Sequence, residues 1–317
     1  MRRLPPALAL AVLVAVPALA SAAPAATPAP PAARLELRVG GVRGAQAPIY
    51  GTVPVTGSIT PYVPGQKVKV SFYLDSRPLA TRTLAVSRGG GETGAFGTSI
   101  VIRRDGRYAV SASHSATPLL GGDTTPRTIW KVRFPSLHPG QCGRVVGGFK
   151  GALARMGYVS GGGSCFNARL AREVLAYRKV NGMARDEQAG ARLVQQAFEG
   201  RGGYRVRYPG AGEHAEVSLA KQVLVLAKGS RPFAIYPVST GKPSTPTVTG
   251  HYHFYLRSPG YNSEGMYFSF YWYRGYAVHG YAEVPNYPAS HGCVRTYIAD
   301  QPRIYFQLHQ GESIFVF

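Results

Sequence analysis

The sequence has few acidic residues, few cysteines and few long apolar runs. Its 317 residues include 15 Asp and Glu against 36 Lys and Arg, which gives a formal charge of +21. That excess favours an anionic partner: nucleic acid, an acidic membrane surface or an anionic cell-wall polymer. The chain is 45% hydrophobic, too apolar for a disordered tail, and its 39 Gly and 25 Pro exclude a coiled coil or long helical bundle. The length is typical of two or three domains.

Signatures of several enzyme classes are also absent from the sequence. It contains no phosphate-binding loop, no dinucleotide fingerprint and no paired-carboxylate site. His251 and His253 would share one face of a predicted strand and could contact a metal, but no third ligand lies nearby in the sequence. We therefore expect neither a metal nor another cofactor.

The longest apolar run lies at the N-terminus. It follows a Met-Arg-Arg start, spans residues 8–19 and leads into the small residues Ala-Ser-Ala, an order typical of a secretory signal peptide. A membrane anchor is the alternative, but Pro17 interrupts the run, which is shorter than the roughly 20 residues that a spanning helix needs. We expect residues 1–22 to be removed after Ala22, leaving a secreted protein without a transmembrane anchor. Export argues against nucleic acid as the natural partner.

An Ala/Pro-rich linker at 23–34 is followed by a pattern of β-strands. Between residues 67 and 74, Val68, Val70 and Phe72 alternate with polar side chains, as in a half-buried strand. Further strands are predicted at residues 35–39, 81–86, 98–102 and 108–112, separated by Gly- or Pro-containing breaks. This spacing predicts a small antiparallel β-sandwich over 35–134. Its Gly-Arg-Tyr-Ala-Val stretch at 106–110 resembles the closing hairpin of immunoglobulin-like modules in bacterial surface proteins, which implies a spacer role.

A helical period replaces the strand period over 135–205. Asn167 is placed to cap a helix, and Asp186 could begin another. Apolar residues at helical spacing predict three short helices: Val146, Phe149, Leu153 and Met156; Leu170, Val174 and Tyr177; Leu193, Val194 and Ala197. Cys142 and Cys165 bracket the first helix, and in an oxidising compartment we expect them to form a structural disulfide.

Residues 174–183, followed by Asp186 and Gly190, resemble the helical peptidoglycan-binding domain family. The usual pattern of that family has an aromatic residue, Asn-Gly-Leu and then Asp-Gly-x-x-Gly. This sequence departs from it at Glu187, where glycine is usual, and at Arg178, where glutamine is usual. The resemblance implies a peptidoglycan-binding-like fold, and the departures leave wall binding by this domain open.

Strands return after residue 212, and the third cysteine lies among them. The predicted strands span residues 217–219, 222–226, 233–238, 251–256, 266–272 and 314–316. Cys293 has no partner left for a disulfide, so it could form an intermolecular bridge, be an inert buried thiol, or be reactive. A reactive thiol needs a base and backbone that can approach the substrate closely. His279-Gly280 and His291-Gly292 each supply an imidazole beside a flexible residue.

The pattern His279-Gly280, a spacer and then Ser290-His291-Gly292-Cys293-Val294-Arg295 resembles the signature of the L,D-transpeptidase (YkuD-type) catalytic domain. Three further landmarks occur in the family's order: Ala-Lys-Gln at 220–222, Ser-Thr-Gly-Lys-Pro at 239–243, and Thr-Pro-Thr at 245–247 with Gly250 beyond. The resemblance covers 213–317. Together with the strand and helix patterns described above, it predicts a mainly β multidomain protein: an immunoglobulin-like β-sandwich, a small three-helix peptidoglycan-binding-like domain and a β-rich catalytic domain.

The resemblance also implies a mechanism. Cys293 is the nucleophile, and it attacks the peptide bond between the third residue and the terminal D-alanine of a tetrapeptide stem. His279 is the general base, oriented by the backbone carbonyl of Gly280, and N–H groups around Gly292 and Cys293 form the oxyanion hole. An amine of a neighbouring stem then takes the acyl group, which gives a 3→3 cross-link. Peptidoglycan stem peptides and anionic wall polymers are the expected partners of a monomeric, cell-wall-located enzyme.

For four residues near this site, the sequence alone does not decide between two possible roles. His291 could be the base, but the family uses the histidine before the loop, so we expect His291 to brace the cysteine loop or contact substrate. Ser290 is either a loop cap or a substrate contact. Arg295 either pairs with a stem carboxylate or makes a structural hydrogen bond. Tyr267, in an otherwise structural aromatic run, could line the cleft.

Two other functions remain open. Water or a different amine could take the acyl group, which would make the protein an L,D-carboxypeptidase or a protein-anchoring acyltransferase on the same chemistry. A non-catalytic wall-binding protein that kept the fold is a third possibility, and the pairing of His279 with Cys293 argues against it.

Overall fold

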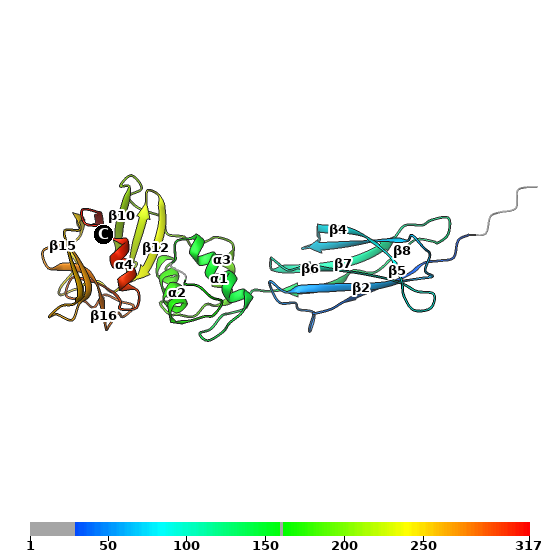
Figure 1. Cartoon of the computed structure of the whole chain (residues 1–317), viewed down its shortest axis with the longest axis horizontal. Coiled ribbons are helices and arrows are strands. Elements are labelled where there is room, and N and C mark those ends of the chain that lie inside the picture. Colours follow the sequence, from blue (N-terminus) through cyan, green and yellow to red (C-terminus); the bar gives the residue numbers. More distant parts are fainter. Residues whose placement is uncertain (1–28, 159–160) are drawn as a thin grey trace, which may run out of the picture.

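The computed structural model describes residues 29–158 and 161–317. The predicted signal peptide at 1–22 and the first part of the linker lie outside this range. The described residues form four β-sheets and four α-helices, so the protein is mainly β. Figure 1 shows a β unit at the N-terminal end, a helical unit in the middle, and a second β unit at the C-terminal end, in a row.

The N-terminal unit contains two packed sheets. One has the strand order β1-β2-β6-β5, and the other has the order β4-β3-β7-β8, with β9 also pairing with β7. Their bounds are β1 (Arg34–Val39), β2 (Thr52–Thr60), β3 (Lys67–Leu74), β4 (Arg77–Ala85), β5 (Ser87–Arg88), β6 (Gly94–Val101), β7 (Gly106–His114), β8 (Asp123–Thr124) and β9 (Thr128–Val132). The alternation in β3 is as predicted, because Val68, Val70 and Phe72 are buried in the core. The Gly-Arg-Tyr-Ala-Val stretch at 106–110 opens β7 and pairs with β9.

The middle unit contains α1 (Arg144–Arg155), α2 (Ala168–Val180) and α3 (Ala191–Phe198). Asn167 caps α2 as predicted, since its side chain accepts a hydrogen bond from the Leu170 N–H at 3.1 Å. The prediction that Asp186 begins the third helix is wrong. Asp186 instead accepts from the Gln188 N–H and pairs with Arg178 on α2, so it stabilises the turn and α3 begins five residues later.

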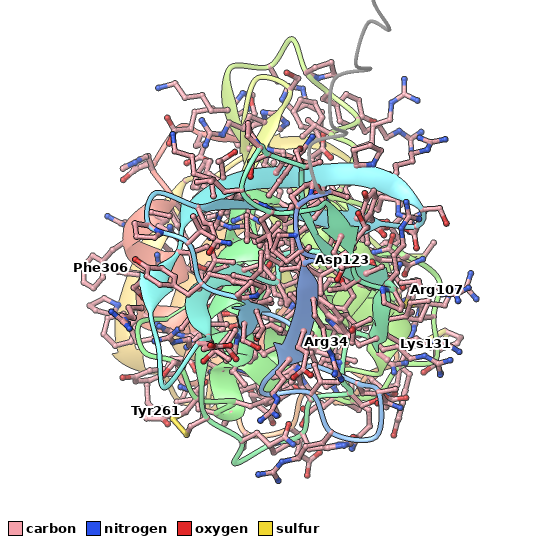
Figure 2. All side chains as sticks on the ribbon, turned by 90° about the vertical axis from the view of Figure 1, so that its right-hand side faces the viewer. Arg34, Arg107, Asp123, Lys131, Tyr261 and Phe306 are labelled. Atoms are coloured by element: carbon pink, nitrogen blue, oxygen red, sulfur yellow. A yellow bond between two sulfur atoms is a disulfide. The ribbon has the colours of Figure 1, made fainter. Side chains whose placement is uncertain are left out.

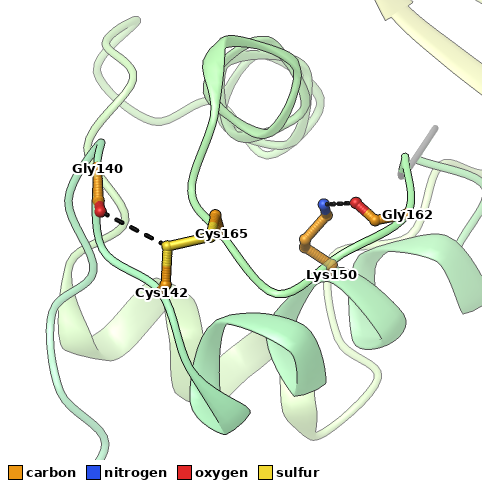
Figure 3. Close-up of a disulfide and its surroundings, with 5 residues drawn as sticks. All are labelled: Gly140, Cys142, Lys150, Gly162 and Cys165. Atoms are coloured by element: carbon orange, nitrogen blue, oxygen red, sulfur yellow. Dashed lines mark hydrogen bonds between the residues drawn. A yellow bond between two sulfur atoms is a disulfide. The ribbon is translucent and has the colours of Figure 1, made fainter.

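The predicted disulfide between Cys142 and Cys165 is present. It joins the segment before α1 to the segment before α2, as Figure 3 shows. Three residues before Cys165, the Gly162 carbonyl accepts a hydrogen bond from Lys150 of α1 at 2.8 Å. These two links hold the α1–α2 connection against α1 and complete a helical unit whose core alone is small.

The C-terminal unit contains two sheets and one helix, α4 (Gln301–Gln307). The first sheet has the order β12-β11-β10-β18-β13 and the second the order β14-β15-β16-β17, with a shared core between them. Their bounds are β10 (Glu213–Ser218), β11 (Val223–Lys228), β12 (Arg231–Pro237), β13 (Gly250–His253), β14 (Leu256–Tyr261), β15 (Tyr267–Tyr273), β16 (Tyr276–Tyr281), β17 (Val294–Tyr297) and β18 (Ser313–Val316). The single strand predicted over 251–256 is wrong. The buried Phe254 marks the point where the chain leaves one sheet for the other.

Helix α2 is joined to the C-terminal unit by buried charged groups. Arg172 holds Asp300 with two hydrogen bonds, from Nε at 2.5 Å and from Nη2 at 2.8 Å, and the Asp300 side chain is only 7% exposed. Lys179 is buried and donates to the carbonyls of Gln222 and Val238, at 3.3 and 2.9 Å. These contacts fix the helical unit on the edge of the first sheet of the C-terminal unit.

We expect Arg172→Ala to lower the apparent Tm of the transition that includes the C-terminal unit by about 5–10 °C. The substitution leaves the buried Asp300 carboxylate without its bidentate partner, a loss on the order of 3 kcal/mol. Arg34→Ala is the matched control, because the Arg34–Glu36 pair is 80% and 49% exposed and should contribute about 0.5 kcal/mol or less. Calorimetry of both variants checks this, and equal shifts would contradict it.

None of the helices within the described ranges has both the length and the apolar character required to cross a membrane.

Candidate active site

The parallel pairing of β16 with β17 brings His279 and Cys293 to one face of the second sheet of the C-terminal unit. The two strands are parallel, with Val278 opposite Val294 and His279 opposite Arg295. Cys293 comes directly before Val294, so it shares the face of His279 at a position two residues back along the neighbouring strand. Strand spacing and rise put the two Cα atoms about 8 Å apart, close enough for a thiol and an imidazole ring to meet.

His279 is oriented by the backbone of the next residue. Its Nδ1 lies 3.0 Å from the Gly280 carbonyl oxygen, and because a carbonyl only accepts, Nδ1 carries the proton and Nε2 has a free lone pair. The ring is 2% exposed. Burial, reinforced by the positive charge of Arg295 and opposed by the Gly280 hydrogen bond, lowers the pKa of His279 to about 4. The imidazole is therefore neutral at physiological pH.

Cys293 is a free cysteine directly before β17, and its side chain is partly exposed. Its Sγ donates to the Gly275 carbonyl at 3.6 Å, in the turn that precedes β16. Burial raises the pKa of the Cys293 thiol, while a hydrogen bond with the Ala277 backbone and the charge of Arg295 partly oppose that rise. The resting pair is thus a neutral thiol beside a neutral imidazole.

Ser290 and Gly292 shape the turn that presents Cys293. The buried Ser290 Oγ donates to the Cys293 carbonyl at 2.6 Å and accepts from the Gly292 N–H at 3.1 Å, so Ser290 acts as the cap of the loop. Gly292 has a φ of +119°, and a Cβ there would lie 2.1 Å from the Tyr276 ring. Glycine is therefore required at this position. His291 is exposed, with its Nε2 3.3 Å from the Lys242 ammonium.

The Ser-Thr-Gly-Lys segment after β12 packs against the cysteine loop. The Thr240 carbonyl accepts from the N–H groups of Ala289 and Ser290, at 2.8 and 2.9 Å. Ser239 exchanges two backbone hydrogen bonds with Arg295. Motifs that are about 50 residues apart in the sequence therefore form one hydrogen-bonded assembly around the cysteine.

Arg295 and Tyr267 occupy different sides of the second sheet. The guanidinium of Arg295 lies over the Tyr281 ring, 4.0 Å from its centroid, on the face that carries His279. Tyr267 pairs with Gly280 instead, and its ring contacts Tyr261 and Phe268 at centroid distances of 4.6 and 4.7 Å. Because paired residues share a face, the structure brings Arg295 to the His279 side and Tyr267 to the other.

Two buried residues, Gln301 and Thr296, hold the backbone around His279 and were not predicted from the sequence. Gln301 of α4 donates to the carbonyls of Phe268 and Val278 and accepts from Thr296 Oγ1 at 2.6 Å. Thr296 Oγ1 also lies 3.1 Å from the His279 carbonyl. This network ties β15, β16 and β17 together. A glutamine at a helix start and a threonine in a short strand carry no signal in a single sequence.

A second missed contact joins the helical unit to the loop between the two site residues. Arg185 donates from Nη1 to the Asn286 carbonyl, and the Asn286 amide donates back to the Arg185 carbonyl, both at 2.7 Å. The α2–α3 turn thus braces the loop at residues 282–293.

No ligand set for a metal accompanies this site. Within residues 29–158 and 161–317, no three His, Cys, Asp or Glu side chains are grouped as metal ligands would be. The rings of His251 and His253 lie 4.9 Å apart, and both contact the Ser313 hydroxyl, at 3.1 and 3.4 Å.

Comparison with known proteins identifies the domain that contains this site. The YkuD family, described as the L,D-transpeptidase catalytic domain, matches residues 212–316. The crystal structure of the L,D-transpeptidase from Xylanimonas cellulosilytica is 25% identical with a TM-score of 0.53, and the match covers 58% of this chain and 98% of that one. No curated protein matches the chain.

Two further solved structures are similar at lower scores. The L,D-transpeptidase from Mycobacterium smegmatis is 11% identical with a TM-score of 0.30, covering 90% of this chain and 99% of that one. The catalytic domain of the E. faecium L,D-transpeptidase is 21% identical with a TM-score of 0.30, covering 34% and 98%. Residues 212–316, which contain His279, Cys293 and the segments packed around them, are a YkuD-type L,D-transpeptidase catalytic domain.

Proposed function

We propose that the protein is an extracytoplasmic peptidoglycan L,D-transpeptidase that forms 3→3 cross-links through a thioester on Cys293. The observation that carries this proposal is the tautomer of His279. Its Nδ1–H is held by the Gly280 carbonyl, so the unprotonated Nε2 is available on the face that it shares with Cys293. A neutral imidazole beside a free cysteine can act as a general base for that thiol.

The acylation half of the reaction breaks one amide bond. The thiol turns from the Gly275 carbonyl toward His279, gives its proton to Nε2, and Sγ attacks the carbonyl carbon of the third stem residue. The N–H of Cys293 stabilises the developing oxyanion, joined by that of Gly292 when it leaves Ser290 Oγ. The C–N bond then breaks, and His279 returns the proton to the amine of the departing D-alanine. The enzyme keeps the acyl group as a thioester.

The second half forms a new amide bond. A side-chain amine on the third residue of a neighbouring stem attacks the thioester, and His279 takes a proton from that amine. The C–S bond breaks, and the thiolate recovers the proton. One amide replaces another, so the exchange needs no external energy source, which suits a reaction outside the cytoplasm.

Because the Cys293 thiol and the His279 imidazole are both neutral at rest, we propose that the proton moves to His279 as the sulfur attacks. A thiolate–imidazolium pair formed before substrate binds is disfavoured. The pKa of His279 is held near 4 by burial, and burial raises that of Cys293, so neither group is charged at neutral pH. Arg295 lies on the same face as both groups, and its charge makes a protonated His279 less stable. We propose that Arg295 also attracts the carboxylates of the stem peptide, since a guanidinium binds carboxylates well.

The pH dependence of acylation tests the state of His279. We expect the acylation rate constant to stay level as the pH falls through 6.5 and to drop only near pH 4, where Nε2 becomes protonated. The lowered pKa also makes the folded state less stable as the pH falls from 6.5 toward 4, because the unfolded chain binds that proton first. Single-turnover rates, with circular dichroism at each pH, check this. A midpoint near pH 6.5 in folded protein would contradict a buried, neutral base.

Incubation with tetrapeptide-bearing muropeptides tests the reaction itself. Mass spectrometry should detect dimers joined between two third residues, together with free D-alanine. Monomeric tripeptides without dimers would make water the acceptor and the protein a carboxypeptidase. Recovery of only unchanged tetrapeptide would reject both activities.

A further inference from the structure

A basic groove runs along the seam between the helical unit and the catalytic domain. It consists of two adjoining cavities of about 600 and 570 Å³, which share Arg207, Ser218, Lys221 and Phe317. Asn181 and Met183 line it from the helical side. The groove lies outside the His279–Cys293 site and is not used by the reaction proposed above.

The charged side chains that line this groove are all basic. Arg205, Arg207 and Lys221 line the first cavity, and Arg185 joins the lining of the second. Lys179 also lines the second cavity, but burial lowers its pKa to about 7, so it adds little fixed charge. Among the described residues that line either cavity there is no Asp or Glu. A concave site whose charged side chains are all basic concentrates positive potential and attracts a negatively charged ligand.

A buried carboxylate holds the backbone of the segment that carries the two exposed arginines. Along the 204–207 segment, Tyr204 and Val206 are buried while Arg205 and Arg207 are exposed, which puts both guanidinium groups on the outer side. Below it, the fully buried Glu216 accepts from the Tyr204 hydroxyl at 2.8 Å and from the Arg207 N–H, and it also accepts from the Tyr208 N–H at 2.7 Å. The carboxylate is engaged by these donors and anchors the segment.

On the opposite wall of the groove, the side chains of Lys221 and Arg185 are held by hydrogen bonds. Lys221 donates to the Val180 carbonyl at 2.6 Å, and its ammonium has two further N–H groups. Arg185 donates to the Ala220 carbonyl at 3.0 Å while it holds Asn286. The cations of this wall are therefore positioned before any ligand arrives, which lowers the entropic cost of binding.

We propose that this seam groove binds an extended polymer with phosphodiester groups. The cations are spread over two joined cavities, which suits a chain with regularly spaced charges better than a single ion. Arginine forks bind phosphate oxygens bidentately. Binding of single-stranded nucleic acid is disfavoured because the two aromatic residues among the described lining are not open for base stacking: Tyr204 is buried, and the guanidinium of Arg207 lies over the Phe317 ring, 4.4 Å from its centroid.

The groove would hold such a polymer beside the catalytic domain. Both units contribute to its walls, and Arg185 joins it to the loop at residues 282–293. A polymer in the groove would anchor the enzyme to its surroundings without occupying the cysteine site. This anchoring is independent of the proposed transpeptidation, so each can fail without the other.

Binding of the full chain to poly(glycerol phosphate) tests the groove, with Arg205→Glu/Arg207→Glu as the variant. The matched control is Arg107→Glu/Lys131→Glu, which makes the same charge change at two exposed, cross-strand neighbours that point outward from the β-sandwich (Figure 2). We expect the groove variant to bind about tenfold more weakly or worse, and the control to change binding by about twofold or less, at 150 mM salt.

The comparison of ligands and variants decides the proposal. Equal losses of affinity in the groove variant and in the control variant would mean that binding depends only on net charge, and this would overturn the proposal. Tighter binding of poly-glutamate or of single-stranded DNA than of the phosphodiester polymer would assign the groove to another ligand class. If the double variant is poorly folded by circular dichroism, Arg205→Gln/Arg207→Gln against Arg107→Gln/Lys131→Gln gives the same comparison with a smaller charge change.

Discussion

Replacement of Cys293 with Ala should abolish cross-linking, with a loss of more than about 10³-fold in dimer formation. The thiol is the only free cysteine of the described chain, and it lies on the face of β17 that is shared with His279. Without it no thioester can form, and the neutral imidazole has no nucleophile to activate. Quantitative mass spectrometry of muropeptide dimers measures the loss.

The Cys293 result is interpretable only if the variant folds. The side chain is small and partly exposed, so Cys293→Ala should leave stability within about 1 kcal/mol of the wild type. Cys293→Ser provides a second check, because it keeps the size and the hydrogen bond to Gly275 but is a far weaker nucleophile at this site. Persistent cross-linking by either folded variant would sink the proposed mechanism.

Replacement of His279 with Gln should slow acylation by about 10²–10⁴-fold, the usual contribution of a positioned general base. Glutamine approximates the volume of the ring and can still reach the Gly280 carbonyl, but it cannot accept the thiol proton. The rate should be measured in a single turnover, so that acylation is separated from transfer to the acceptor amine.

His291→Gln is the matched control for His279. It removes an imidazole only two residues before the nucleophile, but His291 is exposed and faces Lys242, while His279 is buried beside the Gly280 carbonyl. We expect the control to change acylation by less than about tenfold. A larger loss in His291→Gln than in His279→Gln would assign the base to His291.

Local features of the fold could be predicted from the sequence. The alternation in β3, the cap at Asn167 and the pairing of Cys142 with Cys165 depend on neighbouring residues or on the compartment, and the structure contains all three. The residues of the Cys293 motif could also be named, because catalytic motifs conserve local backbone shape around the nucleophile.

Tertiary features of the site could not be predicted in the same way. The parallel pairing of β16 with β17 brings together residues separated by a loop, and nothing in either short strand indicates its neighbour. Asp186 has a typical capping side chain, but in the structure it pairs with Arg178 and accepts from the Gln188 N–H within a turn, so it caps no helix. The sequence leaves Ser290 as either a loop cap or a substrate contact, and only the fold shows that its hydroxyl lies between the Cys293 carbonyl and the Gly292 N–H.

The structure also shows where part of the high positive charge is located. In the sequence, +21 indicates only an anionic partner. In the structure, Arg295 lies on the same face as the cysteine, while Arg205, Arg207 and Lys221 line the seam groove. The first location affects the chemistry of the site, and the second offers a separate place for binding.

The most direct test of the account is to trap the acyl-enzyme and locate the bound group. The wild-type protein is mixed with a tetrapeptide muropeptide in the absence of an acceptor amine, quenched in acid within one turnover, digested and sequenced by tandem mass spectrometry. The account predicts a tripeptide-stem adduct on the peptide that contains Cys293, with the mass expected after loss of D-alanine. An adduct on another residue, or dimers that form while Cys293 remains unmodified at every time point, would contradict it.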